Sequence, residues 1–334
     1  MVENLFLCKD RSSGEYKEGK YGLWNSATFV VDYLNSVGKS SVLSSVVDGN
    51  GIDREIHKYK PKKVILEALW ATPQKIRELQ RLHPTVTFVI RIHSKAPFLA
   101  NEGIALQWCN ELIQIDNVLL TANNIDFVTH MNICGYPTEY LPNIYTDEVF
   151  GAGPNKIISN DIHIGCFGSI RPMKNQLIQA MSAIAFGDYN GYTVHFHMNG
   201  TRSEQNGGNV LKNIIALFDL QDSHQLHLHP WQSHADFIDK VKMMHLGMQA
   251  SYTESFNIVT ADFIRCNIPI VTSKEISINT SLLRADPNSM QQMVSALEFA
   301  NNFGFATNFL SNFKLNKHNL LAKKIWVDFV ELHW

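Results

Sequence analysis

The sequence predicts an α/β protein composed of two doubly wound, Rossmann-like domains. Three observations support this fold class. Short apolar segments alternate with amphipathic stretches through the first half, the alternation stops near Leu141-Pro142-Asn143, and it starts again after residue 160. Strands that alternate with helices form mainly parallel sheets covered on both faces. The length of 334 residues suits two domains of about 150 residues each.

The first domain is expected to comprise residues 1–145. Its expected strands are short, mostly apolar runs at 4–8, 42–47, 64–68, 85–92 and 118–121. Its expected helices are 23–36, a segment that starts near Pro73, 102–115 and 125–133. Residues 85–92 are rich in β-branched side chains, which favours a strand. Gly38 suits the end of the first helix, and Pro73 suits the first turn of the second.

A linker is expected at residues 146–160, where Gly151, Gly153 and Pro154 lie close together. The second domain is expected to comprise residues 161–315. Its expected strands are 162–167, 193–198, 226–229, 247–251 and 269–272. Its expected helices are 174–186, 209–218, 234–244 and 257–265. This second alternation predicts another parallel sheet.

The C-terminal segment, residues 316–334, is expected to form a helix that docks on a domain. Its last part, KKIWVDFVELHW, is amphipathic and offers Ile325, Val327, Phe329 and Val330 for burial. The polar face mixes acidic and basic side chains instead of being basic, which argues against a helix that lies on a membrane surface.

The composition is that of a globular protein without an overall charge bias. Apolar residues make up 45% of the chain, and 29 Lys and Arg face 31 Asp and Glu. No global basic field therefore attracts nucleic acid or anionic lipid. Five scattered cysteines without a C-x-x-C pair indicate reduced, mostly buried thiols. Because we find neither a signal peptide nor a membrane-spanning stretch, we expect a cytoplasmic protein.

The stretch SYTESFNIVTADFIRCNIPIVTS, residues 251–273, is the most informative for function. Glu254 follows an expected strand, and Ser255, Phe256 and Asn257 open an expected helix. The first turn of a helix has unpaired N–H groups, so it can hold a phosphate. Glu254 and Asp262 lie eight residues apart and can accept hydrogen bonds from sugar hydroxyls. The alternative is a capped surface helix with two solvated acids.

A second stretch, IGCFGSIRPMKNQ at residues 164–176, offers two cations after a strand. Arg171 and Lys174 stand in a short loop before a helix. Loops at the carboxyl ends of parallel strands bind ligands, and these cations can neutralise a diphosphate leaving group. The alternative is a pair of exposed basic residues. That alternative is less favourable, because cations at a helix start oppose the helix dipole.

These stretches resemble the retaining glycosyltransferases of the GT-B fold, specifically family 4. That family has two Rossmann-like domains that face across a cleft, a basic loop in the second domain, and a glutamate-x7-glutamate motif. Leu141-Pro142-Asn143 resembles the family's proline-asparagine segment at the end of the first domain. The resemblance implies a nucleoside diphosphate sugar donor, with UDP the expected nucleotide, and no metal requirement.

The resemblance also implies roles for individual residues. Lys174 matches the lysine that contacts the donor diphosphate, and Glu254 matches the glutamate that contacts the transferred sugar. Asp262 matches the acid that holds the ribose, and the turn of Ser255, Phe256 and Asn257 matches the phosphate-binding turn. The chain departs from the family at three positions. Ser169 occupies the arginine position, so Arg171 must substitute. Asp262 is shorter than glutamate, and Asn257 replaces a glycine.

Three further residues are candidates for the site. Trp231 follows the third strand of the second domain, where it would flank a nucleotide base or else lie in the core. Gly22, with Gly19, lies in a loop where the backbone can closely approach a ligand, and the resemblance implies that this ligand is the donor phosphate. His93 follows the fourth strand and resembles the family histidine that contacts the transferred sugar; the alternative is a structural histidine. We expect Glu254, His93 and Lys174 to be the catalytic residues.

Histidines 224, 227, 229 and 234 invite comparison with a metal site. His227 and His229 fall on one face of an expected strand. No nearby cysteine and no ligand spacing matches a known metal site. We therefore expect no metal site in this segment.

The predicted function is transfer of a sugar from a nucleoside diphosphate sugar to an acceptor hydroxyl, with retention of configuration. The segments VVDGNGIDREIH and RIHSKAPFLANEG resemble glycosyltransferases of large tailed phages. This resemblance raises the hypothesis of a hydroxymethylated pyrimidine in phage DNA as acceptor. The basic residues that would form a rim for a duplex are Arg11, Lys17, Lys20, Lys60, Lys62 and Lys63. They are also ordinary solubilising residues.

Two other functions stay open on the sequence. The departures at Ser169, Asn257 and Asp262 suit a protein that binds a sugar nucleotide without transferring it. A GT-B-like epimerase that acts on the sugar nucleotide itself is the second alternative. The sequence sets neither the donor sugar, nor the acceptor, nor the oligomeric state.

Overall fold

The computed structural model describes residues 2–10, 22–151 and 160–332. The chain divides into two compact units. Unit 1 comprises Met1–Thr146 and His318–Trp334, and unit 2 comprises Asp147–Lys317. Residues 152–159 of the predicted linker, and Arg11, Lys17, Gly19 and Lys20, lie outside the described residues.

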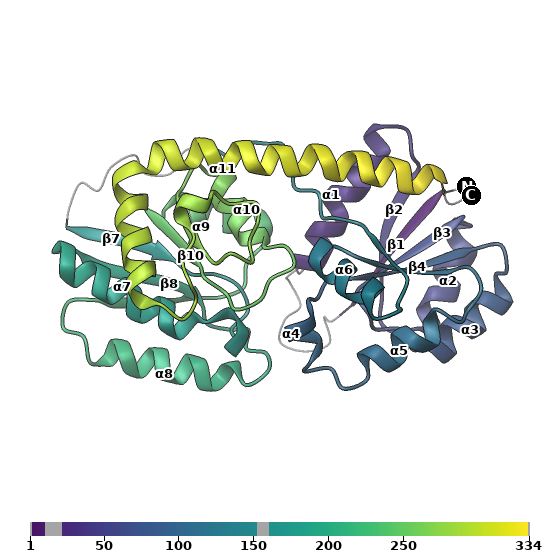
Figure 1. Cartoon of the computed structure of the whole chain (residues 1–334), viewed down its shortest axis with the longest axis horizontal. Coiled ribbons are helices and arrows are strands. Elements are labelled where there is room, and N and C mark those ends of the chain that lie inside the picture. The colour runs from purple at the N-terminus through teal and green to yellow at the C-terminus, as the bar shows by residue number, and fades with distance from the viewer. Residues whose placement is uncertain (1, 11–21, 152–159, 333–334) are drawn as a thin grey trace. The chain divides into compact units, whose positions relative to one another are not determined.

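Unit 1 is built on a six-stranded parallel sheet with the strand order β2-β1-β3-β4-β5-β6 (Figure 1). Its strands are β1 Asn4–Lys9, β2 Ser41–Val46, β3 Lys63–Glu67, β4 Thr87–Ile92, β5 Val118–Ala122 and β6 Thr138–Tyr140. Its helices are α1 Gly22–Ser36, α2 Asn50–Tyr59, α3 Pro73–Leu82, α4 Ala96–Leu99, α5 Ala105–Leu112 and α6 Ile125–Ile133.

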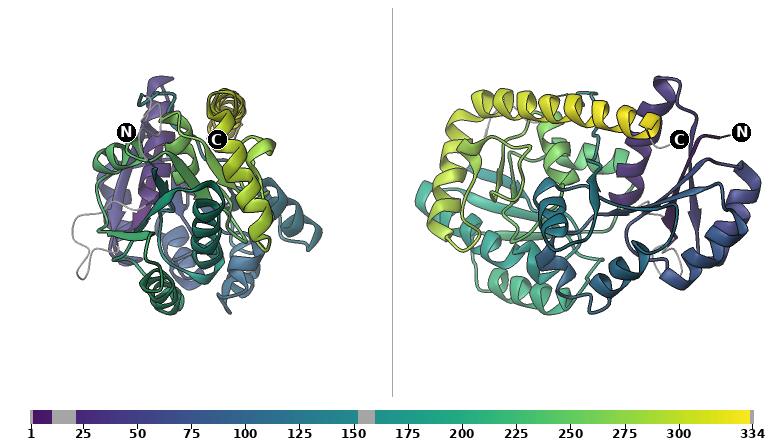
Figure 2. Two further views of the ribbon diagram at one scale, coloured as in Figure 1. Left: turned by 90° about the vertical axis from the view of Figure 1, so that its left-hand side faces the viewer. Right: turned by 45° about the vertical axis from the view of Figure 1, so that its right-hand side comes forward.

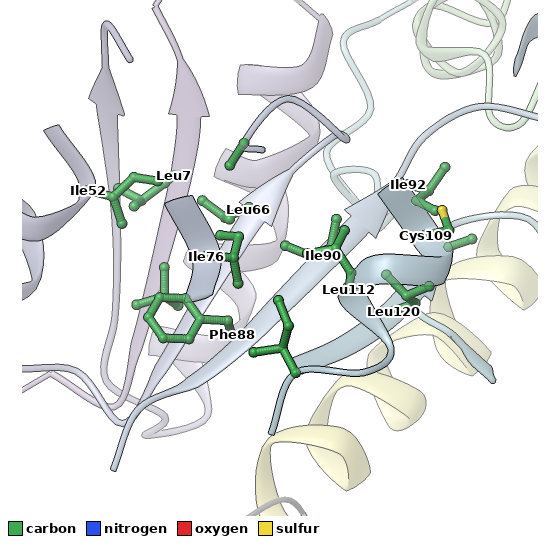
Figure 3. Packing of buried hydrophobic residues seen from close by; sticks show 14 of the residues in the cluster. Leu7, Ile52, Leu66, Ile76, Phe88, Ile90, Ile92, Cys109, Leu112 and Leu120 are labelled. Carbon is green, nitrogen blue, oxygen red and sulfur yellow. The ribbon is translucent and has the colours of Figure 1, made fainter. Parts of the chain in front are cut away.

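Both faces of this sheet are apolar, because alternate residues of its central strands enter two different cores. Leu66 and Ile90 pack with Ile76 of α3 and Leu112 of α5 on one face (Figure 3). The residues that alternate with them along each strand, such as Val89 before Ile90, enter the core on the opposite face. A strand buried on both sides reads as a continuous apolar run, which is why the sequence predicted these strands clearly.

The end of the chain closes the second face of the unit 1 sheet. Trp326, Phe329 and Val330 are buried there with α1, and Ile325 is half-buried against the same core. Val327, also expected to be buried, is half-buried as well. Trp326 is 0% exposed, and its indole N–H donates to the Pro142 carbonyl at 2.8 Å. The terminal segment is therefore a structural part of unit 1.

Unit 2 is built on a five-stranded parallel sheet with the order β11-β10-β7-β8-β9. Its strands are β7 Asp161–Gly165, β8 Thr193–Asn199, β9 Gln225–His229, β10 Leu246–Gln249 and β11 Ile270–Thr272. Its helices are η1 Pro172–Lys174, α7 Gln176–Asn190, α8 Gly207–Asp219, α9 His234–Lys242, α10 Ile258–Arg265, η2 Ser281–Leu283 and the first part of α11 Met290–Leu332. With unit 1, this establishes the predicted α/β fold of two parallel sheets.

One face of the unit 2 sheet carries the main apolar core, formed with α7, α8 and the start of α11. On the other face, Gly165 and Gly247 are register partners on neighbouring strands. A Cβ atom on either glycine would lie within 3 Å of the Phe263 ring of α10. Glycine is therefore needed at both positions so that α10 can lie close to β7 and β10.

Helix α11 bends at Phe303, whose φ of −124° and ψ of 26° are not helical (Figure 2). Gly304 follows the bend, and a Cβ there would lie 3.3 Å from the Pro269 ring. Glycine permits both the kink and this close approach. None of the helices in the described ranges combines the length and apolarity that crossing a bilayer requires.

Several elements differ from the sequence expectation. Helix α2 and strand β6 were not predicted, because α2 buries few apolar side chains and β6 has three residues. Residues 102–115 yield only the shorter α5, and α11 starts far before residue 316. The asparagines that lower helix propensity in α11 are Asn301, Asn302, Asn308, Asn312, Asn316 and Asn319. Tertiary hydrogen bonds offset this: Asn312 donates to the Ile264 carbonyl at 3.0 Å.

Candidate functional site

The strand order of unit 2 places a switch point between β7 and β10. From β7 the chain proceeds to β8 and β9 on one side, and it then crosses to β10 and β11 on the other. In open parallel sheets, the loops that leave such neighbouring strands diverge and form a crevice at the carboxyl ends. The two sequence stretches singled out for function are the loops after β7 and after β10.

Lys174 and Glu254 meet at this switch point. Lys174 ends η1, and Glu254 lies in the loop between β10 and α10; their side chains form an ion pair. Both side chains are largely buried, with 12% and 8% exposed. Burial lowers the pKa of the Lys174 ammonium, and the Glu254 carboxylate partly opposes this effect. The structure therefore brings together two of the three predicted catalytic residues.

Two amide side chains hold the loops in this position. Asn175, in the left-handed conformation, donates to the carbonyls of Ala250 at 3.1 Å and Pro287 at 2.7 Å. Gln179 donates to the Lys174 carbonyl and accepts from the Ala250 amide, both at 2.8 Å. Neither residue was predicted from the sequence. Asn175 directly follows Lys174 and Gln179 lies in the first turn of α7, but their roles depend on hydrogen bonds to Ala250 and Pro287 that the folded chain forms.

The start of α10 is organised by Asn257, the residue that replaces the family glycine. Its side-chain oxygen accepts from the Thr260 amide at 2.7 Å and so caps the helix. Its side-chain amide donates to buried Gln249 at 2.8 Å. Helix geometry leaves the amides of Ile258 and Val259 without intrahelical acceptors. Ser255 and Phe256, directly before the cap, are partly exposed.

Buried hydroxyl groups without hydrogen-bond partners lie in the same loops. Ser251 and Thr253 follow β10, and Ser273 follows β11; their side-chain oxygens are buried and lack a partner within the described part of the chain. The Thr260 hydroxyl in α10 is in the same situation. Such groups are rare in folded proteins, because an unsatisfied buried hydroxyl costs about 1–3 kcal/mol. Their concentration at the carboxyl edge of the sheet suits a site that receives a polar ligand.

Asp262 lies on α10 and is buried, with 1% of its surface exposed. His234, the first residue of α9, contacts the Asp262 carboxylate at 2.7 Å. Burial lowers the pKa of His234, but the hydrogen bond and the charge of Asp262 outweigh it and raise that pKa. A ribose that reached Asp262 would therefore meet the imidazole of His234 as well. This pairing was not predicted, because 28 residues separate His234 from Asp262.

Arg171 and Trp231 belong to a second group of contacts, at the ends of β7, β8 and β9. The Arg171 guanidinium lies 3.5 Å from the Glu204 carboxylate, which also accepts from Arg202 at 2.8 Å. The Arg202 guanidinium lies over the Trp231 ring, 4.9 Å from its centroid. Trp231 is half-buried and does not belong to the core. Arg202 and Glu204 were not predicted from the sequence.

His93 lies in unit 1, in a network of polar side chains at the ends of β3, β4 and β5. Glu67 is fully buried, and Arg91 donates to both of its carboxylate oxygens at 3.1 and 3.0 Å. His93 contacts the same carboxylate at 2.5 Å. Burial raises the pKa of Glu67, but Arg91 and His93 outweigh this effect and hold it below its usual range.

The other nitrogen of His93 is also engaged. Asn123 lies 3.2 Å from His93 Nδ1, and its amide also donates to Asn143 at 3.2 Å. Burial and the nearby Arg91 lower the pKa of His93 and favour neutral imidazole. The proposed contact of His93 with a sugar therefore requires one of these hydrogen bonds to be released.

Gly22 is exposed at the start of α1.

The segment Leu141-Pro142-Asn143 completes this network. The Arg91 side chain donates to the Leu141 carbonyl at 3.1 Å, to the Pro142 carbonyl at 2.9 Å and to Asn143 Oδ1 at 2.7 Å. Asn143 donates in turn to the Ser26 hydroxyl at 2.9 Å. The proline-asparagine segment thus serves as an acceptor surface for one buried guanidinium.

A layer of histidines covers part of the unit 2 sheet, on the face opposite the apolar core. His163 of β7 bonds His197 of β8, and His197 bonds His229 of β9, each at 2.8 Å between ring nitrogens. His195 and His227 form a parallel pair at 2.9 Å. Burial and neighbouring imidazoles lower the pKa of His163 to about 4 and that of His197 to about 2. We define these five residues as the histidine layer.

The four histidines considered for a metal site have separate roles. His227 and His229 belong to the histidine layer, and His234 bonds Asp262. His224 accepts from the Val194 amide at 3.0 Å and contacts Asp188 at 3.1 Å. Across the described ranges, these four residues do not gather into a group of metal ligands.

The sequence matches no established protein-family profile and no curated protein. The fold is similar to several solved structures. Sucrose-phosphate synthase from Thermosynechococcus elongatus superposes with a TM-score of 0.73 at 10% identity, with 99% of both chains covered. HepE from Anabaena in complex with UDP-glucose gives 0.71 at 14% identity, covering 99% of this chain and 100% of that one.

A third similar structure is that of an E. coli protein bound with UDP-2-fluoro glucose. Its TM-score is 0.67 at 9% identity, and 98% of this chain and 99% of that chain are covered. The architecture shared with these structures is the GT-B fold of two Rossmann-like domains. At these identities the likeness concerns the fold.

Proposed function

We propose that this protein is a glycosyltransferase that takes a sugar from a nucleoside diphosphate sugar bound by unit 2. The observation that carries the proposal is the pairing of Lys174 with Glu254 at the switch point, beside buried hydroxyls without partners. The UDP-sugars in the HepE and E. coli structures support UDP as the donor nucleotide.

The contacts suggest how a donor would bind. Its diphosphate would compete for Lys174, and Glu254 would then be free to accept hydrogen bonds from sugar hydroxyls. The amides of Ile258 and Val259 would face the phosphates at the start of α10. Cations placed where negative charge develops on the leaving diphosphate stabilise the transition state. Arg171 adds a second positive charge at the end of β7.

The nucleoside would contact the remaining candidates. Trp231, with Arg202 over one face, offers a flat surface for a base. Asp262 and His234 offer an acceptor and a donor for ribose hydroxyls. We assign no protein nucleophile. Retention of configuration would then follow from attack on the same face that the diphosphate leaves.

A ligand panel tests this proposal directly. Thermal unfolding is measured with UDP, GDP, ADP and TDP and with their glucose esters, because ligands that bind the folded state raise its apparent stability. A shift by UDP and UDP-glucose in the wild type, and in the control Lys212→Ala on the exposed side of α8, supports donor binding. Absence of any shift across the panel contradicts the proposal.

Product analysis separates transfer from the two alternatives. A transferase releases nucleoside diphosphate in the presence of an acceptor hydroxyl. An epimerase converts the sugar nucleotide without any acceptor, and a binding protein leaves the donor intact. Loss of turnover in Glu254→Gln, with donor binding retained, would assign the chemistry to this site.

A DNA acceptor is a separate part of the proposal. Of the basic residues that suggested it, Lys60 and Lys62 are exposed. Lys63 is 2% exposed and donates to the Val330 carbonyl at 3.0 Å, so it cannot line an exposed rim. Salt-dependent binding of duplex DNA that contains 5-hydroxymethylcytosine would support this acceptor, and no binding at low salt would remove it.

A further inference from the structure

Unit 1 holds three metal-ligand side chains close together, and the proposed sugar transfer does not use them. Asp53 and His57 lie on α2, and His83 directly follows α3. One ligand atom from each residue lies within 4.8 Å of the other two. His83 Nε2 is 2.7 Å from Asp53 Oδ1, and His57 Nε2 is 3.5 Å from the same oxygen.

Helix α2 positions Asp53 and His57, and backbone hydrogen bonds position His83. Asp53 and His57 are four residues apart, so they share one face of α2. The His83 backbone is held on both sides, because its amide donates to the Leu79 carbonyl at 2.8 Å and its carbonyl accepts from Val86 at 3.0 Å. Helices α2 and α3 both pack into the same apolar core. The His83 side chain is 11% exposed, whereas that of His57 is 72% exposed.

The two cations of α2 that lie near Asp53 pair with Glu55 and not with the Asp53 carboxylate. The Arg54 guanidinium pairs with Glu55 at 3.2 Å, and the Lys58 ammonium lies 4.0 Å from Glu55. Glu55 thus neutralises the charges of Arg54 and Lys58. The Asp53 carboxylate instead contacts the imidazoles of His57 and His83. Their rings are arranged edge to face, with centroids 5.1 Å apart.

We propose that Asp53, His57 and His83 bind a divalent transition metal ion, with Zn²⁺ the expected occupant. Imidazole nitrogens and one carboxylate suit Zn²⁺, Co²⁺ and Ni²⁺, whereas Mg²⁺ and Ca²⁺ prefer all-oxygen sites. Bond lengths near 2.0–2.2 Å require ligand atoms about 3.0–3.5 Å apart. The separations of 2.7 and 3.5 Å are close to this requirement. Exposure of His57 leaves the outer side of the ion to water, and the ion would join α2 to the end of α3.

The test uses the full chain after removal of metal with a chelator. Calorimetric titration with Zn²⁺ is compared between the wild type, His57→Ala and Asp53→Asn. The control is His130→Ala, an exposed histidine on α6. We expect one Zn²⁺ that Mg²⁺ does not displace, and affinity lower by a factor on the order of ten or more in both ligand variants. The control should bind as the wild type does.

His57→Ala is the decisive variant, because its exposed side chain can be removed without disturbing the core. The visible absorption of bound Co²⁺ provides a second readout, since it changes when a ligand is lost. Zn²⁺ binding of equal affinity and stoichiometry in His57→Ala and Asp53→Asn would overturn the proposal and would point to other histidines, such as those of the histidine layer. Absence of Zn²⁺ binding in the wild type would also overturn it.

Discussion

Each of the two sheets carries polar side chains at its own carboxyl edge, but the hydrogen bonding of these side chains differs between the units. In unit 1, Glu67 and Arg91 neutralise each other, and backbone carbonyls take up the rest of the guanidinium. In unit 2, Lys174 and Glu254 also form an ion pair, but Ser251 and Thr253 beside them leave their hydroxyls without partners in the described ranges. Around the unit 1 pair, the side-chain oxygen of Asn123 lacks a partner in the described ranges, whereas several hydroxyls lack one around the unit 2 pair. A nearly saturated network holds a fold together, whereas an unsaturated one is suited to a ligand.

If saturation marks a structural role, Arg91→Met should have the largest effect on stability. It leaves the Glu67 carboxylate buried without its main partner, and breaking a buried ion pair in this way costs about 3–5 kcal/mol. Urea denaturation followed by circular dichroism measures the loss. The control is Arg54→Met, whose side chain is 73% exposed and whose effect should stay within about 0.5 kcal/mol. Equal effects of the two variants would contradict the comparison.

If the unit 2 site is the reactive one, Lys174→Met should reduce turnover more than stability. Loss of a group that stabilises the leaving diphosphate lowers kcat by about 10²–10³. The measurement is the rate of nucleoside diphosphate release with the donor that the ligand panel identifies. Lys212→Met on α8 should keep the wild-type rate. A Lys174→Met variant with full activity would show that this pair has the same structural role as its counterpart in unit 1.

Acid should destabilise unit 2, because unit 2 carries the histidine layer. The pKa of His163 is lowered to about 4, and that of His197 to about 2, from an ordinary value near 6.5. Below pH 6.5 the unfolded chain therefore binds more protons than the folded one, so stability falls as the pH drops from 6.5 toward 4. Asp161, which faces His195, and Lys240, which faces His227 and His229, also contribute to the local charge.

The measurement is the urea midpoint at pH 7.5, 6.0 and 5.0, which we expect to fall steadily. A double variant, His163→Gln and His197→Gln, should flatten this dependence, whereas His130→Gln on α6 should not. His234 opposes the trend, because its raised pKa adds stability at low pH. A midpoint that does not change between pH 7.5 and 5.0 would argue against neutral, buried histidines in unit 2.

The smallest expected effect concerns Asn257, where the chain departs from glycine. Asn257→Ala removes the cap of α10 and should lower the free energy of unfolding by about 0.5–2 kcal/mol. Asn257→Gly should lower it by only a few tenths of a kcal/mol. Asn257→Gly also releases the Thr260 amide, so we expect donor affinity to be kept or increased. Donor titration of the two variants compares these effects. Weaker binding in Asn257→Gly would mean that the asparagine side chain itself contacts the donor.

Local patterns predicted most of the fold, because they record which residues are buried. The strands of unit 1 are apolar on both faces, and Pro73 marks the start of α3, where Thr72 caps the helix. The long α11 was underestimated, because its asparagines reduce helix propensity and their compensating contacts come from distant residues.

The site was predictable only as far as its loops. Lys174 and Glu254 were each predicted as residues of the site, and loops after parallel strands converge at one edge of a sheet. Asn175, Gln179, Glu204 and Glu67 could not be chosen from the many polar residues of the sequence, because their roles depend on hydrogen bonds that only the folded chain forms. For the same reason the histidine layer was not predicted, because its five members come from three separate strands.

The cysteines have a practical consequence. All five are free, and Cys134 alone is exposed. Burial raises the pKa of Cys109 to about 11 and that of Cys166 and Cys266 to about 12, and it raises the pKa of Cys8 as well. A thiolate is the reactive form, so a maleimide dye at neutral pH should attach to Cys134 at the end of α6. The natural sequence thus carries a single labelling position for fluorescence measurements, with no engineered cysteine required.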